Sequence, residues 1–280
     1  MEIRKDVISL DSGKPGKITT IVAGIHGNEI CGMKAFAKLI PNIKIIAGKV
    51  NFVYGNLRAI EKNVREIDVN LNRLFRPDDE LTETEKSSYE YSRSQKLKKL
   101  FDQSDALLDI HSSRNENSVP FAIVAKQSFD IAQKMPFKIK SSGWDIVEPG
   151  GTDDYMNRQN KINICAECGY NLDPESIKRA QDIIKIFLKL MGNIDEDIKL
   201  YNGEQKLIHA YYIYHTKTNN FKLNKKFKDF EFIKKDTLIG IDGEEKIVAS
   251  EDSYIIFALN KNQIGVEAFI LGKKCLSEEK

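Results

Sequence analysis

The feature that most restricts the fold of this 280-residue chain is an alternation of short apolar runs with segments of helical period. The alternation fills the first two thirds of the sequence, and its apolar runs are rich in β-branched residues, as in strands that are covered on both faces. It predicts an α/β fold in which helices flank a mostly parallel, mixed sheet. The predicted strands are residues 18–25, 50–55, 106–111, 121–125 and 162–167.

Three segments between or after these strands predict helices. Residues 28–40 place apolar side chains along one stripe, and Pro41 ends the pattern. Residues 84–101 are more polar and carry a narrower apolar face. The strongest helical pattern is that of residues 174–191, which begins with a proline in the first turn and is followed by Gly192.

The character of the sequence changes after about residue 193, where a polar linker leads into short β-rich runs separated by Gly, Asp and Asn turns. We therefore expect two domains. One would be an α/β domain of residues 1–200, and the other a small β domain of residues 201–280. The later predicted strands are residues 207–214, 230–233, 246–249 and 254–259.

The charge of the chain is nearly balanced, with 43 basic and 41 acidic residues and a formal net charge of +2. This balance gives no reason to expect nucleic acid or an anionic membrane as a partner. The first residues lack the apolar core of a secretory signal, and no apolar run reaches the length of a membrane span. We therefore expect a cytoplasmic protein, and a homo-oligomer is compatible with the sequence.

The four cysteines fit a reducing compartment as free thiols. Cys165 and Cys168 form a CxxC pair, which in other settings indicates a redox site or half of a zinc knuckle. Here the pair lies in an apolar run that predicts a strand, and no second cysteine pair exists to complete a tetrahedral site. The position of the pair therefore favours structural thiols.

His26 and Glu29 follow the first predicted strand, at the point where a helix should begin. In a parallel sheet, ligands bind at the carboxyl ends of the strands. An imidazole and a carboxylate three residues apart can converge there on one metal ion, and Gly27 between them lets the backbone bend tightly. Taken alone, such a pair is also typical of a surface histidine and a first-turn glutamate that the helix dipole stabilises.

His111 ends the third predicted strand, so it should project from the same edge of the sheet as His26. Two histidines and one glutamate form the ligand set of hydrolytic zinc sites, which leaves a fourth position for water. The pattern therefore predicts one zinc ion per chain, held by His26, Glu29 and His111. Asp109, two residues earlier on the same strand face, would orient the His111 imidazole.

A further carboxylate, Glu167, ends the strand predicted at residues 162–167. Buried carboxylates are uncommon without a partner, so this position is either a satisfied strand end or a functional group. Beside a metal site on the same sheet edge, the functional interpretation gains weight. Glu167 would then act as a general base that takes a proton from water and passes it to the leaving group.

Arg65, Asn72 and Arg73 lie in a loop-like region after the second predicted strand. Arginine grips a carboxylate through two parallel hydrogen bonds or stabilises a developing oxyanion, and a neighbouring asparagine adds a neutral donor. Arginines in a loop are more often plain surface residues. These three residues are therefore candidates whose role depends on where the fold places them.

Four stretches of the sequence together resemble the succinylglutamate desuccinylase and aspartoacylase family, whose members are relatives of the zinc carboxypeptidases. The stretches are GIHGNE, NLRAIEKNVREIDVNLNRLF, LLDIHSS and CAECGY, in the family's order between about residues 24 and 170. The β-rich region that follows is also similar to the family's. The resemblance implies a zinc carboxypeptidase-like fold. It also implies that His26, Glu29 and His111 are zinc ligands and that Glu167 is the catalytic base.

The same resemblance implies roles for the loop residues. Arg65 matches the arginine that polarises the scissile carbonyl, and Asn72 and Arg73 match the pair that holds a substrate carboxylate. The chain departs from the family at Asn70, where relatives commonly have aspartate, and in having Leu57 where relatives often have proline. These departures remove neither a metal ligand nor the base, and they leave the identity of the substrate open.

The favoured hypothesis is therefore a zinc-dependent deacylase that hydrolyses an N-acyl amino acid or a similar small, carboxylate-bearing amide. A zinc carboxypeptidase that acts on short peptides would use the same residues. An alternative of another class is a non-catalytic metal-binding protein that uses the cleft to bind a ligand. The sequence identifies neither the acyl group nor the amino acid, and it assigns no role to the C-terminal β region.

Overall fold

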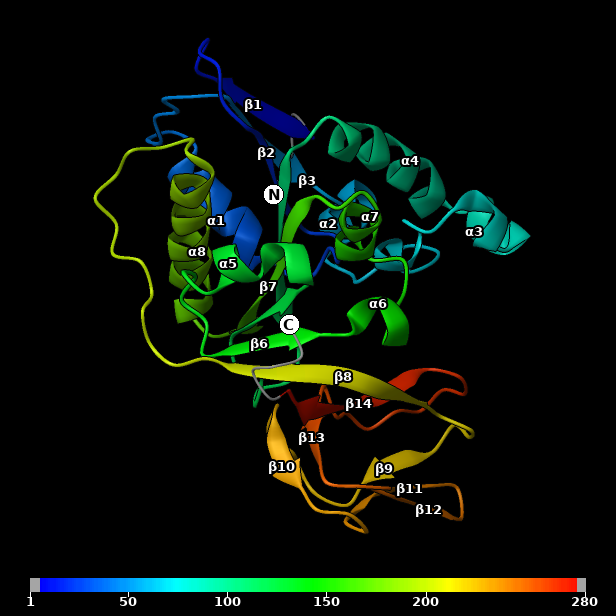
Figure 1. Cartoon of the computed structure of the whole chain (residues 1–280). Coiled ribbons are helices and arrows are strands. Elements are labelled where there is room, and N and C mark those ends of the chain that lie inside the picture. Colours follow the sequence, from blue (N-terminus) through cyan, green and yellow to red (C-terminus); the bar gives the residue numbers. More distant parts are fainter. Residues whose placement is uncertain (1–5, 276–280) are drawn as a thin grey trace.

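A single sheet of eleven strands runs through the computed structural model, which describes residues 6–275 (Figure 1). Its edges are formed by strands from the two ends of the chain. In hydrogen-bonding order the strands are β1 (Val7–Asp11), β3 (Lys49–Tyr54), β2 (Ile18–Ala23), β4 (Ala106–Ser113), β7 (Ile162–Tyr170), β5 (Phe121–Val124), β6 (Ile139–Ser142), β8 (Lys206–His215), β14 (Glu267–Lys274), β13 (Ser253–Ile256) and β10 (Glu231–Ile233).

The N-terminal half of this sheet is mostly parallel. Strand β2 pairs in parallel with β3 and β4, and β4 pairs in parallel with β7, whereas β1 and β5 join as antiparallel strands. The predicted α/β fold with a mostly parallel, mixed sheet is thus confirmed. All five strands predicted in the first two thirds are present, and β4 and β7 each extend beyond the predicted end because their pairing continues from His111 opposite Glu167 to Ser113 opposite Tyr170.

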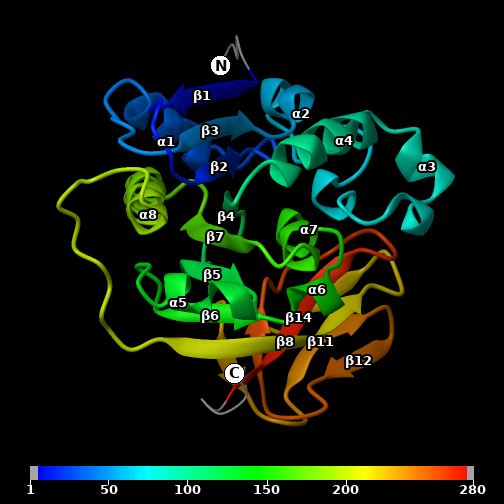
Figure 2. The same ribbon diagram turned by 45° about the horizontal axis from the view of Figure 1, so that its top comes forward.

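Helices cover both faces of the parallel strands (Figures 1 and 2). Helices α1 (Cys31–Leu39) and α8 (Glu175–Met191) pack against each other on one face, where Ile21 of β2 joins their core. The next residue, Val22, points to the other face and packs with Leu97 of α4 (Tyr89–Asp102) and Met156 of α7 (Thr152–Arg158). This alternation explains why both faces of these strands carry apolar residues. The remaining short helices are α2 (Leu57–Lys62), α3 (Glu83–Lys86), α5 (Phe129–Ala132) and α6 (Trp144–Val147).

The helix predicted at residues 84–101 is divided into α3 and α4. Thr82 caps the first piece in a capping box with Glu85, and the hydroxyl of Ser88 accepts a hydrogen bond from the backbone N–H of Tyr91 to cap the second. A second N-cap inside one polar segment starts a new helix with its own direction. The predictions for residues 28–40 and 174–191 correspond to α1 and α8, and Gly192 follows α8 in the left-handed conformation.

The C-terminal strands extend the main sheet. Strand β8 follows the predicted linker and pairs in parallel with β6, after which β14, β13 and β10 continue in antiparallel fashion. A second, three-stranded sheet consists of β12 (Glu245–Val248), β11 (Leu238–Asp242) and β9 (Phe221–Leu223). These strands have a core of their own, centred on aromatic residues such as Phe221 and Phe269. Because the sheet crosses residue 200, the proposed division into domains of residues 1–200 and 201–280 stays a prediction.

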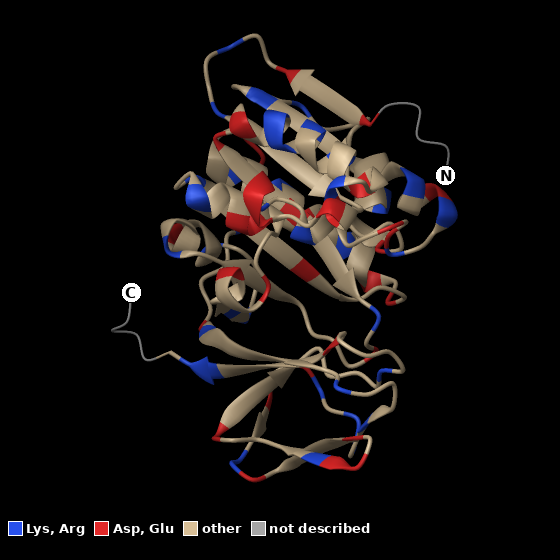
Figure 3. Cartoon of the chain, turned by 90° about the vertical axis from the view of Figure 1, so that its right-hand side faces the viewer, with Lys and Arg blue, Asp and Glu red and all other residues tan. Residues whose placement is uncertain are grey.

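Two further features of the chain bear on its partners. Basic and acidic positions are interspersed over both halves (Figure 3). Within residues 6–275, no helix has the length and apolarity needed to cross a lipid bilayer. Cys165 and Cys168 are buried in β7 as free thiols, in agreement with the strand predicted around them.

Candidate metal centre and active site

The turn after β2 brings two predicted ligands against the loop that carries Arg65. A Cβ atom on Gly27 would lie only 2.1 Å from the backbone carbon of Ala59 in α2, so a side chain there would force the two segments apart. The backbone N–H of Gly27 donates to the carbonyl oxygen of Arg65 (3.1 Å). This close approach, which only glycine permits, fixes His26 and Glu29 beside the Arg65 loop.

His26, Glu29 and His111 converge at the carboxyl edge of the sheet, and we call them the ligand cluster. One donor atom of each lies within 4.8 Å of the others. The Nδ1 atoms of His26 and His111 lie 2.8 Å and 3.0 Å from the two carboxylate oxygens of Glu29. All three residues are at most 5% exposed. Two imidazoles and one carboxylate that aim at one buried point have the chemistry of a hydrolytic zinc site, so these residues fit the predicted metal.

The three residues of the ligand cluster strongly affect one another's pKa values. Burial raises the pKa of Glu29, but the two imidazoles outweigh this effect and hold it well below its usual range. Burial and the charge of Arg65 lower the pKa of His26 to about 4, which leaves its imidazole neutral. Burial lowers the pKa of His111, but Asp109 prevails and raises it well above its ordinary value. Because metal binding requires deprotonated ligands, a divalent cation would replace the proton that this cluster otherwise holds.

Each imidazole of the ligand cluster is also held at its other nitrogen. Nε2 of His111 lies 2.9 Å from Oδ2 of Asp109, as the strand spacing predicted, and the same oxygen accepts the hydroxyl of Thr152 (2.6 Å). Nε2 of His26 lies 3.1 Å from Oδ1 of Asn70. With a metal at Nδ1, Nε2 of each ring would carry the proton; Oδ1 of Asn70 is placed to accept it from His26, and Asp109 lies within ion-pair distance of His111. Such contacts orient ligating histidines in metal sites.

Replacing Asn70 by leucine is expected to weaken metal binding by about 10- to 100-fold, the usual range for the loss of a residue that orients a ligating histidine. The amide oxygen that accepts from His26 is lost, while the volume of the side chain is retained. Competition with a chelating dye would measure the affinity. As the matched control, Asn70→Asp keeps an acceptor at the same place and should bind metal at least as tightly as the wild type. Equal affinities of Asn70→Leu and wild type would contradict this role of Asn70.

Glu167 lies on β7 opposite His111 of β4 in the strand register. Its side chain is buried, and among the described residues its Oε2 atom has no hydrogen-bond partner. Burial raises the pKa of Glu167 to about 8; the charge of His111 opposes this effect, and that of Glu29 adds to it. A carboxyl group that can exchange a proton near neutral pH beside a ligand cluster has the properties of a general base.

The loop residues are placed differently from one another. Arg65 reaches the ligand cluster, since its Nη1 lies 3.2 Å from Oε1 of Glu29, and its side chain is partly exposed. Arg73 instead contacts two carboxylates through Nη2, that of Glu148 at 2.5 Å and that of Glu267 at 3.0 Å. The oxygen of Asn72 accepts the backbone N–H of Thr152 (3.1 Å), which ties this loop to α7. The substrate-binding role that the resemblance gives to Asn72 and Arg73 stays a prediction.

Glu148 and Glu267 were not found by sequence reasoning. Glu148 ends the short helix α6 just before the Pro149–Gly151 turn, and Glu267 begins β14, a strand that was not predicted. Neither position has a motif that marks it. Only a carboxylate at the start of the apolar run of β14 could have drawn attention to Glu267.

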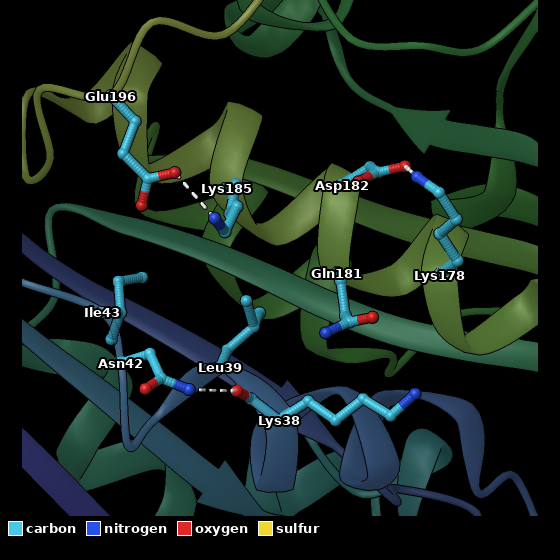
Figure 4. Close-up of a pocket in the computed structure, with 9 residues that line it drawn as sticks. All are labelled: Lys38, Leu39, Asn42, Ile43, Lys178, Gln181, Asp182, Lys185 and Glu196. Atoms are coloured by element: carbon cyan, nitrogen blue, oxygen red, sulfur yellow. Dashed lines mark hydrogen bonds and ion pairs between the residues drawn. The ribbon is translucent and has the colours of Figure 1, made fainter.

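A pocket of about 460 Å³ lies away from this site, between α1, α8 and the segment that follows α8 (Figure 4). Most of its charged residues are already paired: Lys185 with Glu196, and Lys178 with Asp182, both at 2.7 Å. The pocket contains no member of the ligand cluster. We therefore assign the candidate site to the ligand cluster at the sheet edge and not to this pocket.

Comparison with known proteins identifies the family. The family model described as the succinylglutamate desuccinylase/aspartoacylase catalytic domain matches residues 15–191, which is more than half of the chain and includes the ligand cluster, Arg65 and Glu167. This chain belongs to the succinylglutamate desuccinylase/aspartoacylase family. The family's names describe deacylases, which are hydrolases that act on amide bonds.

Individual relatives in this family cover different shares of the chain. A succinylglutamate desuccinylase of Pseudoalteromonas atlantica is 34% identical over 89 residues, which are 30% of this chain and 25% of that protein. An aspartoacylase of Danio rerio is 33% identical over 107 residues, 35% of this chain and 34% of that protein. This chain thus spans about a third or less of the length of these two relatives. The solved structure of succinylglutamate desuccinylase from Vibrio parahaemolyticus has the same fold, with a TM-score of 0.76 at 18% identity over 96% of this chain and 86% of that one.

Proposed function

We propose that this protein is a zinc-dependent hydrolase that removes the acyl group from an N-acyl amino acid or a similar small, carboxylate-bearing amide. The observation that carries the proposal is the convergence of His26, Glu29 and His111 at one buried point, with Arg65 in contact and Glu167 on the neighbouring strand. Membership of a deacylase family supports the type of reaction. The substrate class comes from the family resemblance together with the arginines of the loop.

The ligand cluster would hold the metal through Nδ1 of His26, Nδ1 of His111 and the carboxylate of Glu29. When bound, zinc supplies a Lewis acid that lowers the pKa of water towards about 7 and polarises a carbonyl group. Asp109 and Asn70 hold the two imidazoles in the orientation and tautomer that this binding needs.

The other residues supply proton transfer and charge stabilisation. Glu167 takes a proton from the water that attacks the amide carbon, and it later delivers this proton to the nitrogen as the carbon–nitrogen bond breaks. Burial and the charge of Glu29 raise its pKa in the metal-free site, and a bound cation would lower that pKa, so that the carboxylate form needed to accept the proton would be available near neutral pH. The guanidinium of Arg65 donates hydrogen bonds to the carbonyl oxygen as negative charge develops there. The products are a free carboxylic acid and the amino acid.

The proposal is tested by assaying the zinc-loaded protein against a panel of N-acetyl and N-succinyl amino acids and short peptides, with release of free amine as the readout. We expect hydrolysis of at least one acylated amino acid. Chelator treatment should remove both the activity and the zinc, the latter measured by elemental analysis, and adding zinc back should restore them.

Each alternative predicts its own result on the same panel. Faster cleavage of peptides than of any acylated amino acid would overturn the substrate class and identify a carboxypeptidase. A protein that retains about one zinc per chain and hydrolyses nothing would overturn the enzymatic function and favour a non-catalytic binding protein.

A further inference from the structure

The loop of residues 65–70 carries two side chains of the candidate site, one at each end. Arg65 contacts Glu29 at 3.2 Å, and Oδ1 of Asn70 lies 3.1 Å from Nε2 of His26. The loop contains neither helix nor strand, and none of its residues is buried. Apolar packing therefore contributes little to its position, and a segment of this kind is mobile unless polar contacts hold its backbone.

A buried carboxylate of α4, that of Glu90, supplies such contacts. Its Oε1 atom accepts the backbone N–H of Ile67 at 2.8 Å and the side-chain amide of Asn56 at 3.0 Å. Its Oε2 atom accepts the backbone N–H groups of Asp68 at 3.2 Å and Val69 at 3.5 Å. Successive backbone N–H groups form a concave site for an anion, and their hydrogen bonds to a carboxylate are stronger than those between neutral groups.

Further hydrogen bonds join the loop to its neighbours on both sides. On the α4 side, Oδ2 of Asp68 accepts the backbone N–H of Tyr89, the first residue of the helix, at 2.9 Å. On the other side, the carbonyl oxygen of Arg65 accepts the backbone N–H of Gly27 at 3.1 Å. The loop thus lies between the start of α4 and the turn that holds His26 and Glu29.

The surroundings of Glu90 indicate that its contribution is to loop conformation more than to stability. Glu90 is fully buried. Arg93, one turn further along α4, pairs with Asp6 and donates to the carbonyl oxygens of Tyr54 and Gly55. The hydrogen bonds of Glu90 described above come from the loop and from Asn56, and none of these donors carries a charge that would offset the burial of a carboxylate. Burying a charged group is costly, so what such a group gives in return is one defined arrangement of its partners.

We propose that Glu90 is a positioning residue of the active site. By holding the backbone of residues 67–69, it places Arg65 at the reacting carbonyl and Asn70 at the His26 imidazole. This inference rests on the proposed function, in which Arg65 stabilises the oxyanion and Asn70 orients a metal ligand. Both roles are sensitive to displacements of about 1 Å, so a loop that has lost its anchor would perform them poorly.

The first test replaces Glu90 by glutamine, which keeps the shape of the side chain but turns one acceptor oxygen into an NH₂ group. We expect zinc affinity, measured by competition with a chelating dye, to fall by about 10- to 100-fold, as for the loss of other groups that orient metal ligands. At saturating zinc, kcat should fall by a similar factor. Glu61→Gln, which changes an exposed carboxylate of α2, is the matched control and should leave both quantities unchanged.

The second test distinguishes positioning from a general effect on the fold. If Glu90 acts on the metal through Asn70, Glu90→Gln should weaken zinc binding by no more than about two-fold in a protein that already carries Asn70→Leu. At saturating zinc, its effect on kcat should likewise shrink to about two-fold in the Arg65→Ala background. A general loss of stability would lower both quantities by the same factor in every background.

Amide hydrogen exchange of residues 67–69 gives a readout that needs neither metal nor substrate. Exchange should be faster in Glu90→Gln than in the wild type, with unchanged exchange in the central strands. If Glu90→Gln does not fold, Glu90→Asp, which keeps the charge but withdraws the carboxylate by one methylene group, is measured in the same way.

Two results would overturn the role of Glu90. One is a zinc affinity and a kcat that stay within about two-fold of the wild type, and the other is an equal loss in all backgrounds. If the wild type binds zinc but hydrolyses nothing, the proposed function fails, and the zinc affinities of Glu90→Gln with and without Asn70→Leu decide the inference alone. If the wild type binds no zinc, hydrogen exchange decides it, and equal exchange in variant and wild type would contradict it.

Discussion

Replacing His111 by alanine is expected to lower the zinc content of the purified protein from about one ion per chain to near zero and to abolish amide hydrolysis. His111 supplies one of three donors, and its Nδ1 atom lies 3.0 Å from the carboxylate of Glu29. Without that imidazole, only His26 and Glu29 would remain as protein ligands, and they would bind zinc far more weakly. Elemental analysis after gel filtration is the measurement, and activity with added zinc is the second readout.

The fold must be checked in the same experiment. His111 is buried between Asp109 and Glu29, so the alanine variant leaves two carboxylates near each other without the imidazole. His111→Gln keeps a polar side chain at this place and is the second variant. His215→Ala removes an exposed histidine at the end of β8 and should leave zinc content unchanged. A well-folded His111→Gln protein that retains a full zinc ion would show that the ligand assignment is wrong.

Replacing Glu167 by alanine is expected to lower kcat by about 10²- to 10⁴-fold, the usual range for the loss of a general acid–base group. Zinc content should stay at its wild-type level, because Glu167 is not in the ligand cluster. A lower kcat with an unchanged zinc content would distinguish a general base from a metal ligand. The expected effect of Glu167→Gln is equally large, because the amide has nearly the same shape as the carboxylate but cannot accept the proton.

A matched control for charge removal is Glu245→Gln, which changes an exposed carboxylate of β12 that pairs with Lys217. It should leave both kcat and zinc content unchanged. If Glu167→Gln turned over substrate within about two-fold of the wild-type rate, proton transfer would have to be assigned elsewhere. If it instead lost zinc, Glu167 would belong to the ligands rather than to the base.

The central strands could be predicted because both of their faces are covered by helices. Strands such as β2 and β4 are buried at almost every position and carry apolar residues on both faces, a pattern that neighbouring residues in the sequence reveal. Strand β1 lies at the sheet edge and is only partly buried, so its pattern is weak. Strand β6 is short and contains serine; its Ser141 is nonetheless buried, because its hydroxyl donates to the carbonyl oxygen of Ile208 in β8. That partner is distant in the sequence, so no local pattern could predict the strand.

The candidate site shows the same contrast between features that the local sequence reveals and contacts with residues far along the chain. His26, His111 and Glu167 follow apolar strands, and the carboxyl ends of parallel strands meet at one edge, so their proximity could be predicted from the sequence. The partners of Arg73 could not be predicted, because Glu148 and Glu267 reach it from a short helix and from a strand far along the chain. Contacts of that kind depend on how the C-terminal strands return to the sheet.

The position of β14 in the strand order has a consequence for how the protein is made. This strand lies between β8 and β13, and β8 in turn covers the edge of β6. Until residues 267–274 have been made, the facing edges of β8 and β13 therefore stay open, with backbone groups free to pair with another chain. Glu267 reaches Arg73 only when that last strand is inserted. The insertion of β14 thus fills the gap between β8 and β13 and forms the contact between Glu267 and Arg73 in one event.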